Sequence, residues 1–251
     1  MKDKVLQLTE IIKNSTNTVF FGGAGVSTES NIPDFRSEKG LYSAQEKYGY
    51  TPEELLSHNC FKHMTELFFR YYKENMIYMD ALPNPAHKAL AWMEASGKLS
   101  CVITQNVDGL HQMAGSKNVL ELHGANDRQY CVKCNKKYDL MYILYQGNCD
   151  GFIPKCACGG VVRPDVVLYG EGLDNDVTSS AVSAIRRAEC LIVGGTSLAV
   201  YPAAGLIEYL PENGTLVLIN KSTTPYDDHA DLIIRENIGE VLGMVQLKLQ
   251  I

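Results

Sequence analysis

The fold is decided by the run Phe20-Phe21-Gly22-Gly23-Ala24-Gly25-Val26-Ser27-Thr28-Glu29-Ser30-Asn31-Ile32-Pro33-Asp34-Phe35-Arg36-Ser37, in which a strand-like stretch leads into a glycine loop and a charged, aromatic tail. Gly22, Gly23 and Gly25 place no Cβ in the path of a pyrophosphate. We expect a helix that begins near Ser27 and donates its amides to that group. The run lacks the third glycine of the dinucleotide fingerprint, and the acidic residue expected about 20 positions on is not evident. The glycines alone are equally compatible with a tight strand-to-helix turn.

Composition limits the class of protein. The chain has 251 residues, 45% hydrophobic and 21% charged, enough to bury the core of one large domain or of one domain with an insertion. The N-terminal MKDKVLQLTEIIKN is amphipathic without a cleavable signal, and no stretch approaches the about 20 apolar residues of a membrane span. We expect a soluble, cytoplasmic protein without membrane partners.

The net charge of the chain is −6, which argues against nucleic-acid binding. The oligomeric state stays open, a monomer included.

Short β-branched runs recur along the chain, and each stops at a polar or glycine residue. Helical patterns lie between them, which predicts an α/β fold with a Rossmann-like, doubly wound parallel sheet. The predicted strands cover residues 18–21, 101–104, 190–193, 216–219 and 232–234. The predicted helices cover about 3–13, 60–79, 85–97, 176–188, 202–210 and 239–249.

The ends of these strands carry glycine or polar residues. They are Gly22 to Gly25, Gln105-Asn106, Gly194 to Ser197, and Asn220. Ligands of such sheets bind beyond the carboxyl ends of the strands. Each segment alone reads as an ordinary strand-ending turn, but the four together predict a ligand site at one edge of the sheet.

Two stretches interrupt the core pattern and predict a smaller second domain. Residues 36–85 form a helical insertion and residues 125–165 carry cysteine pairs, which leaves residues 1–35, 86–124 and 166–251 for the Rossmann-like domain. Helical spacing favours core packing, over a binding function, for the aromatic run Phe68-Phe69-Arg70-Tyr71-Tyr72.

Cysteine spacing predicts a zinc ribbon. Cys131-x-x-Cys134 and Cys156-x-Cys158 form two close pairs, and Gly159-Gly160 follows the second. Four thiolates leave no open coordination position, so the predicted ion is one structural zinc. The alternative is that these are reduced cysteines packed as small hydrophobic residues. Cys149 competes as a ligand, but its spacing from Cys156 is long for a knuckle. The cysteines in apolar contexts, expected to be inert, are Cys60, Cys101 and Cys190.

Several further motifs carry a resemblance to a known family. They are Thr104-Gln105-Asn106-Val107-Asp108-Gly109-Leu110-His111, LHGA, RPDVVLYGE, GGTSLAVYPA and LIN, in addition to GAGVSTESNIPDFRS and the cysteine pairs. With these the chain resembles the sirtuins of bacterial type, from the glycine loop through Asn220 to the last strand near Ile238. The resemblance implies an NAD-dependent protein lysine deacetylase, with NAD consumed as co-substrate and acetyl-lysine proteins or peptides as partners.

The resemblance implies the reacting residues. In the family reaction the acyl oxygen of the modified lysine attacks C1′ of the nicotinamide ribose, nicotinamide leaves, and an alkylimidate forms on ADP-ribose. His123, in Leu122-His123-Gly124, is then the general base that activates a ribose hydroxyl, which its near-neutral pKa suits. Water completes the release of lysine and O-acetyl-ADP-ribose, Asn106 steers the ribose and a water, and the zinc takes no part.

The resemblance also implies the NAD contacts. Phe35 and Arg36 belong to a lid over the reacting ribose, and Asp108 holds the carboxamide with Val107, although Asp108 also reads as a helix N-cap. The implied set is Gly22, Ala24, Gly25, Thr28, Phe35, Arg36, Gln105, Asn106, Val107, Asp108, His123, Gly195, Thr196, Ser197, Asn220 and Ile238.

The peptide substrate is expected to lie as a strand between two segments. Gly170 and Glu171 form one side of this groove, and Ala199 and Val200 form the other. Val167 and Tyr169 flank the acyl-lysine tunnel. Sirtuins that remove acidic acyl groups carry a Tyr and an Arg three apart, where the closest alignment here gives Phe69 and Tyr72. The resemblance therefore favours acetyl or other neutral acyl groups.

Three other functions remain open at this point. Mono-ADP-ribosyl transfer to protein would use the same NAD site. A non-enzymatic NAD-sensing module would need no base beside the ribose, so His123 argues against it. Hydride transfer by an ordinary dehydrogenase fits the predicted fold. It does not account for the zinc ribbon, and the dinucleotide fingerprint of such enzymes is incomplete here.

Overall fold

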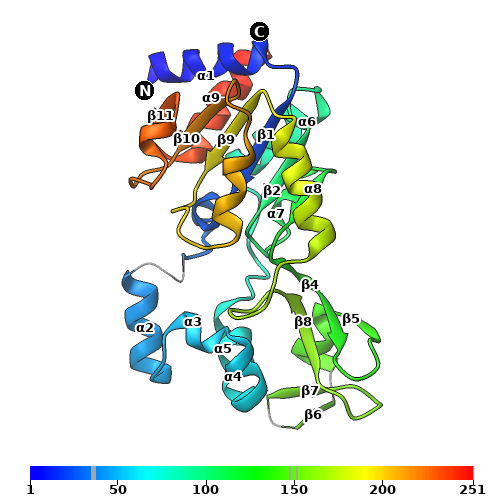
Figure 1. The fold of residues 1–251 in the computed structure, drawn as a ribbon. Coiled ribbons are helices and arrows are strands. Elements are labelled where there is room, and N and C mark those ends of the chain that lie inside the picture. Colours follow the sequence, from blue (N-terminus) through cyan, green and yellow to red (C-terminus); the bar gives the residue numbers. More distant parts are fainter. Residues whose placement is uncertain (35–37, 147, 151, 251) are drawn as a thin grey trace.

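A six-stranded parallel sheet forms the centre of the molecule. The computed structural model describes residues 1–34, 38–146, 148–150 and 152–250. The strands follow the order β11-β10-β9-β1-β2-β3, and each neighbouring pair is parallel (Figure 1). They are β1 (Thr18–Gly22), β2 (Cys101–Thr104), β3 (Val119–Glu121), β9 (Cys190–Gly194), β10 (Thr215–Ile219) and β11 (Leu232–Ile234). The Rossmann-like sheet is confirmed. From β1 the chain first adds β2 and β3 on one side of the sheet and later adds β9, β10 and β11 on the other side. The point at which the strand order reverses, where such sheets bind ligands, therefore lies between β1 and β9.

Helices cover both faces of the sheet, and β1 shows why its sequence is continuously apolar. Phe20 belongs to one hydrophobic cluster, whereas Val19 and Phe21 belong to the other. One face is covered by α1 (Lys2–Asn14), α6 (Pro85–Ala95) and α9 (Ile238–Leu249); the other by α8 (Asn175–Arg186) and the 3₁₀ helix η4 (Ala203–Tyr209). Within the described ranges no helix is both long and apolar enough to span a bilayer.

A second module lies at the opposite end of the molecule from both termini (Figure 1). Its apolar side chains form one cluster of their own, which joins helices to strands. Its elements are α2 (Glu38–Tyr48), α3 (Pro52–Leu55), α4 (His58–His63), α5 (Thr65–Asn75), β4 (Gly124–Cys131), β5 (Lys137–Asp139), the π-helix η3 (Tyr142–Gln146), β6 (Asn148–Asp150), β7 (Ile153–Lys155) and β8 (Val162–Val166). The buried aromatic run 68–72 packs in this cluster as expected. The exact domain boundaries stay a prediction.

Two local expectations were wrong. No α-helix begins near Ser27; two 3₁₀ turns, η1 (Ala24–Val26) and η2 (Thr28–Ser30), follow β1, and Asn31 with a left-handed φ of 63° ends them. The helix expected over 60–79 is split between α4 and α5 at Met64, whose φ of −130° is not helical. By contrast, the strand expected over 232–234 is β11, and the helix expected over about 239–249 is α9, which begins at Ile238. The remaining short elements are α7 (Leu110–Ala114) and η5 (Asp227–His229).

Candidate functional site

The glycine loop packs backbone to backbone against the loop after β9. The amide of Gly25 donates to the carbonyl of Gly195 at 2.7 Å, and Gly23 donates to Gly194 at 3.3 Å. A Cβ on Gly25 would lie 2.7 Å from the Cα of Gly195, and a Cβ on Gly195 would lie 2.4 Å from the nitrogen of Val26. These glycines are therefore required by contact between the loops. The amides of Gly23 and Gly25 are committed to this contact, and the predicted clearance for a pyrophosphate stays a prediction.

The loop after β2 joins this pair of loops. Asn106 Nδ2 donates to the carbonyl of Gly23 and to Ser27 Oγ, both at 3.0 Å. Ser27 Oγ donates to Asp108 Oδ2 at 2.6 Å. Asp108 Oδ1 accepts the amide of Leu110 at 2.9 Å, so this carboxylate also holds the first turn of α7. Both roles considered for Asp108, helix start and site wall, are compatible with this geometry.

Two further loops complete the edge of the sheet. Gln105 Nε2 donates to Thr196 Oγ1 at 3.1 Å, and the Thr196 amide donates to Asn220 Oδ1 at 3.0 Å. Gln105, Thr196 and Asn220 are all buried. The four strand ends singled out in the sequence are therefore connected by hydrogen bonds at one edge.

His123 is held in one tautomer. Its Nδ1 lies 2.8 Å from the carbonyl oxygen of Gln105, which can only accept, so Nδ1 carries the proton and the lone pair is on Nε2. The preceding residue, Leu122, is buried, and its amide donates to the carbonyl of Thr104 at 2.9 Å. Gly124 follows with φ 75°, and a Cβ there would lie 2.0 Å from the carbonyl of Asp165. The Leu-His-Gly sequence is thus required by its surroundings, and it leaves a half-buried imidazole with Nε2 as the basic nitrogen.

A cavity of about 390 Å³ runs between the sheet edge and the second module. Its volume lies in the range of roughly 300–1,000 Å³ usual for small-molecule sites. Eleven predicted site residues line it: Ala24, Gln105, Asn106, Val107, Asp108, His123, Val167, Tyr169, Gly170, Glu171 and Val200. Polar groups of three strand ends thus meet an apolar groove, an arrangement that fits a dinucleotide beside an extended chain.

Other predicted residues lie outside the lining. Ile238 is buried in the core, where its side chain occupies the space a Cβ on Gly194 would need, so only its backbone is available to a ligand. Phe35 and Arg36 lie outside the described residues. The others that do not line the cavity are Gly22, Gly25, Thr28, Gly195, Thr196, Ser197, Ala199 and Asn220.

Sequence reasoning missed two polar residues of the site. The glycine-loop pattern predicts only a helix start at Ser27, although a hydroxyl inside such a loop is itself a signal. Asn126 is buried, accepts a 2.8 Å bond from the Tyr72 hydroxyl, and donates to the carbonyl of Met76 at 2.6 Å. Its amide donates to Val107 at 2.8 Å, so Asn126 ties α5 to the loop after β2. No local pattern marks it.

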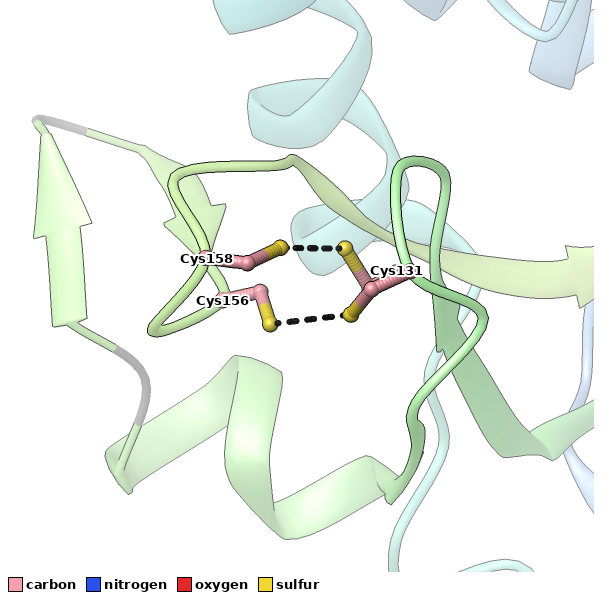
Figure 2. A group of neighbouring side chains, drawn as sticks. Cys131, Cys156 and Cys158 are labelled. Carbon is pink, nitrogen blue, oxygen red and sulfur yellow. Dashed lines mark hydrogen bonds between the residues drawn. The ribbon is translucent and has the colours of Figure 1, made fainter.

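The four cysteines of the predicted ribbon come together. Their Sγ atoms all lie within 4.8 Å of one another, with 3.5 Å between Cys131 and Cys158 and 3.6 Å between Cys134 and Cys156. Figure 2 shows the sulfur atoms facing one another across two loops. Thiolates about 2.3 Å from one zinc ion would lie roughly 3.8 Å apart. The cluster therefore fits tetrahedral zinc. The side chain of Cys149 lies outside the described residues.

The surroundings of the cluster support thiolate ligands. The Tyr138 hydroxyl donates to Cys156 Sγ at 3.1 Å and lowers the pKa of that thiol to about 6. The pKa of Cys158 moves the other way: the Gly160 amide lowers it, but the neighbouring sulfurs of Cys134 and Cys156 raise it to about 12, so without an ion the four thiols do not all ionise together. Gly160 allows close approach, since a Cβ there would lie 2.6 Å from Cys131 Sγ. By contrast, burial raises the pKa of Cys101 to about 11 and of Cys190 to about 12, as expected for inert thiols.

A buried histidine pair beneath the site predicts how stability depends on pH. His87 and His111 pack ring to ring at 4.7 Å. Burial lowers the pKa of His87 to about 4 and of His111 to about 3, the latter helped by its neighbour. Unfolded histidine titrates near ~6.5, so below that pH the unfolded chain binds more protons.

We therefore expect the free energy of unfolding to fall as pH drops from about 6.5 to 5, by up to roughly 1.4 kcal/mol per pH unit for each of the two. Urea unfolding at several pH values measures this slope. His111→Gln should reduce it, and an unchanged slope in that variant would show that His111 does not contribute.

The sequence of the chain is similar to the sequences of known proteins. The Sir2 family model matches residues 23–202. The chain is 57% identical over 244 residues to the NAD-dependent protein deacetylase of Clostridium acetobutylicum, covering 97% of this chain and 98% of the relative. It is 60% identical over 237 residues to that of Clostridium tetani, covering 94% of each.

Solved structures agree in fold. Sir2Tm bound to a propionylated peptide superimposes with a TM-score of 0.87 at 37% identity, with 98% of each chain covered. Sir2 with p53 peptide and NAD+ gives 0.85 at 37% identity, with 96% and 97% covered. The chain belongs to the Sir2 family.

Proposed function

We propose that this protein is an NAD-dependent protein lysine deacetylase, which transfers the acetyl group of lysine to ADP-ribose and releases nicotinamide and O-acetyl-ADP-ribose. The observation that carries the proposal is His123, a base with a defined tautomer in the wall of the cavity that Asn106 and Asp108 also line. The relatives named above bear the same activity in their names.

The residues of the chain have distinct tasks in this reaction. NAD supplies the electrophilic ribose carbon and the nicotinamide leaving group. His123 Nε2 accepts a proton from a ribose hydroxyl, while the bond from Nδ1 to Gln105 stabilises the imidazolium that forms. The Asn106 side chain donates through Nδ2 to Gly23 and Ser27, which leaves Oδ1 to orient a hydroxyl or a water. Asp108 and Val107 would hold the carboxamide.

The peptide is proposed to lie between Gly170-Glu171 and Ala199-Val200. The main chain of Tyr169 is committed, since its amide donates to Leu56 at 3.0 Å and its carbonyl accepts from His58 at 2.9 Å. Gly170, with a left-handed φ of 87°, is therefore the better candidate for pairing with the peptide backbone. Val167 and Tyr169 would flank the acyl chain.

The cavity predicts a preference for neutral acyl groups. Among the described residues that line it there is no Lys or Arg, whereas Asp108, Asp127 and Glu171 are present. The Tyr72 hydroxyl already donates to Asn126, and Phe69 is fully buried. Along this described part of the lining, an acidic acyl group would meet no cation. We expect succinyl-lysine to be removed at least about 100-fold more slowly than acetyl-lysine from one peptide sequence, a ratio equivalent to roughly 2.7 kcal/mol. Comparable kcat/KM values would contradict this.

A cytoplasmic location is also proposed. The described cysteines form no disulfide, and a zinc site needs its thiols reduced, which cytosolic conditions favour.

Mass spectrometry tests the function. An acetyl-lysine peptide is incubated with the purified protein, with and without NAD, and free lysine, nicotinamide and O-acetyl-ADP-ribose are followed together. NAD-dependent appearance of all three supports deacetylation. Nicotinamide release with ADP-ribose on protein, and with the acetyl group retained, would instead support mono-ADP-ribosyl transfer.

A further inference from the structure

One ion pair joins a residue of β8 to the segment that follows this strand. Arg163 Nη1 donates to Glu171 Oε1 at 2.6 Å, and Nη2 donates to Oε2 at 3.0 Å. The Arg163 side chain is 6% exposed and that of Glu171 is 22% exposed, so this bidentate pair is largely shielded from water. Residues 164–170, which include three of the predicted substrate contacts, Val167, Tyr169 and Gly170, lie between its two ends.

The arginine is fixed from several directions. Its guanidinium lies 5.0 Å from the ring of Phe61 and 5.7 Å from the ring of Tyr130. Nη2 also donates to the carbonyl of Val166 at 2.7 Å, and Nε donates to Pro164 at 3.2 Å. Arg163 is therefore an anchor for both ends of the segment.

The carboxylate is equally committed. Besides Arg163, Glu171 accepts the amide of Leu168 at 2.9 Å and contacts His58 Nδ1 at 2.9 Å. Burial alone would raise the pKa of Glu171, but hydrogen bonds led by that from Arg163 lower it to about 2. Although Glu171 lines the cavity, both of its oxygens already bind the protein.

The segment also touches the proposed base. The amide of Val167 donates to the carbonyl of His123 at 2.9 Å, while Tyr169 bonds to Leu56 and His58 on its other side. The segment that the ion pair spans is thus bonded directly to the main chain of His123.

We propose that Arg163 and Glu171 are positioning residues, which hold Val167–Gly170 in the peptide-binding conformation without contacting the substrate through their side chains; this rests on the proposed function. A segment ordered in advance loses less conformational entropy when the peptide binds. Loss of the pair should therefore appear in peptide binding, whereas the NAD side of the cavity is built by other loops.

Steady-state kinetics of Glu171→Gln and Arg163→Lys test this, in the full chain with NAD. We expect KM for an acetyl peptide to rise about tenfold, with kcat and KM for NAD within about twofold of the parent. The matched control is Glu189→Gln: its carboxylate also accepts two bonds, from the amide and hydroxyl of Thr16 at 2.7 and 2.8 Å, but lies before β9, remote from the cavity. It should leave all three constants unchanged. Melting temperatures establish that each variant is folded.

The outcomes are separable. A parent protein that releases no lysine overturns the proposed function itself. An active parent with an unchanged peptide KM in folded Glu171→Gln overturns only the positioning role. Peptides with neutral and with basic flanking residues are compared: a uniform rise in KM supports positioning, and a rise confined to basic peptides would mean that Glu171 contacts the substrate directly.

Discussion

His123→Ala is expected to lower the rate of NAD-dependent deacetylation by about 10²- to 10⁴-fold, the usual contribution of a general base. The tautomer set by Gln105 makes Nε2 the only basic nitrogen of the ring, and alanine removes it. Alanine also removes the bond to the Gln105 carbonyl, but the surrounding loops stay joined through the side chains of Gln105, Asn106 and Thr196. NAD should therefore still raise the melting temperature of the variant.

The matched control is His63→Ala. His63 is exposed at the end of α4 and is not part of the cavity lining. Substitutions at such surface positions usually change the free energy of unfolding by only about 0.5 kcal/mol, so the variant should stay folded. Because His63 does not line the cavity, the rate of lysine release should stay within about twofold of the parent. Parent-like activity in His123→Ala would refute the assignment of the base.

Cys156→Ala is expected to reduce bound zinc from one ion per chain to nearly none and to loosen the second module. Cys131 and Cys156 are part of the hydrophobic cluster of that module, so the ion would connect its strands to its core. Structural zinc contributes about 10–16 kcal/mol in isolated zinc-finger peptides, and a loss of several kcal/mol is expected here. Elemental analysis measures the ion, and hydrogen exchange of β4, β5 and β8 measures the loosening.

Cys190→Ala is the control for thiol loss. Burial raises the pKa of Cys190 to about 12, so it is a neutral thiol in the sheet core and remote from the cluster. This variant should keep one zinc per chain and normal exchange in the second module. Zinc-free protein after gentle purification, or a full zinc complement in Cys156→Ala, would contradict the ribbon.

The strands of the sheet could be predicted from the sequence because a parallel strand buried on both faces appears as a continuous run of apolar residues. The run 18–21 is β1 (Thr18–Gly22) and the run 190–193 is β9 (Cys190–Gly194), each extended by one residue. The prediction of a helix from Ser27 was wrong, because the backbone adopts a left-handed conformation at Asn31, four residues later. The prediction of one helix over 60–79 was wrong because the amphipathic spacing continues across Met64, whereas the helical backbone conformation is interrupted at that residue.

What the sequence by itself determined is local: strands, most helices, the cysteine spacing, and the motif that contains His123. Hydrophobic periodicity and short-range spacing are properties of neighbouring residues, so one chain suffices to read them. Tertiary structure decided the rest. Gly25 against Gly195, Ser27 against Asp108, and Arg163 with Glu171 behind the peptide segment depend on how loops meet after the sheet has formed. Such contacts leave no periodic signal, because each joins residues whose spacing along the chain is set by topology alone.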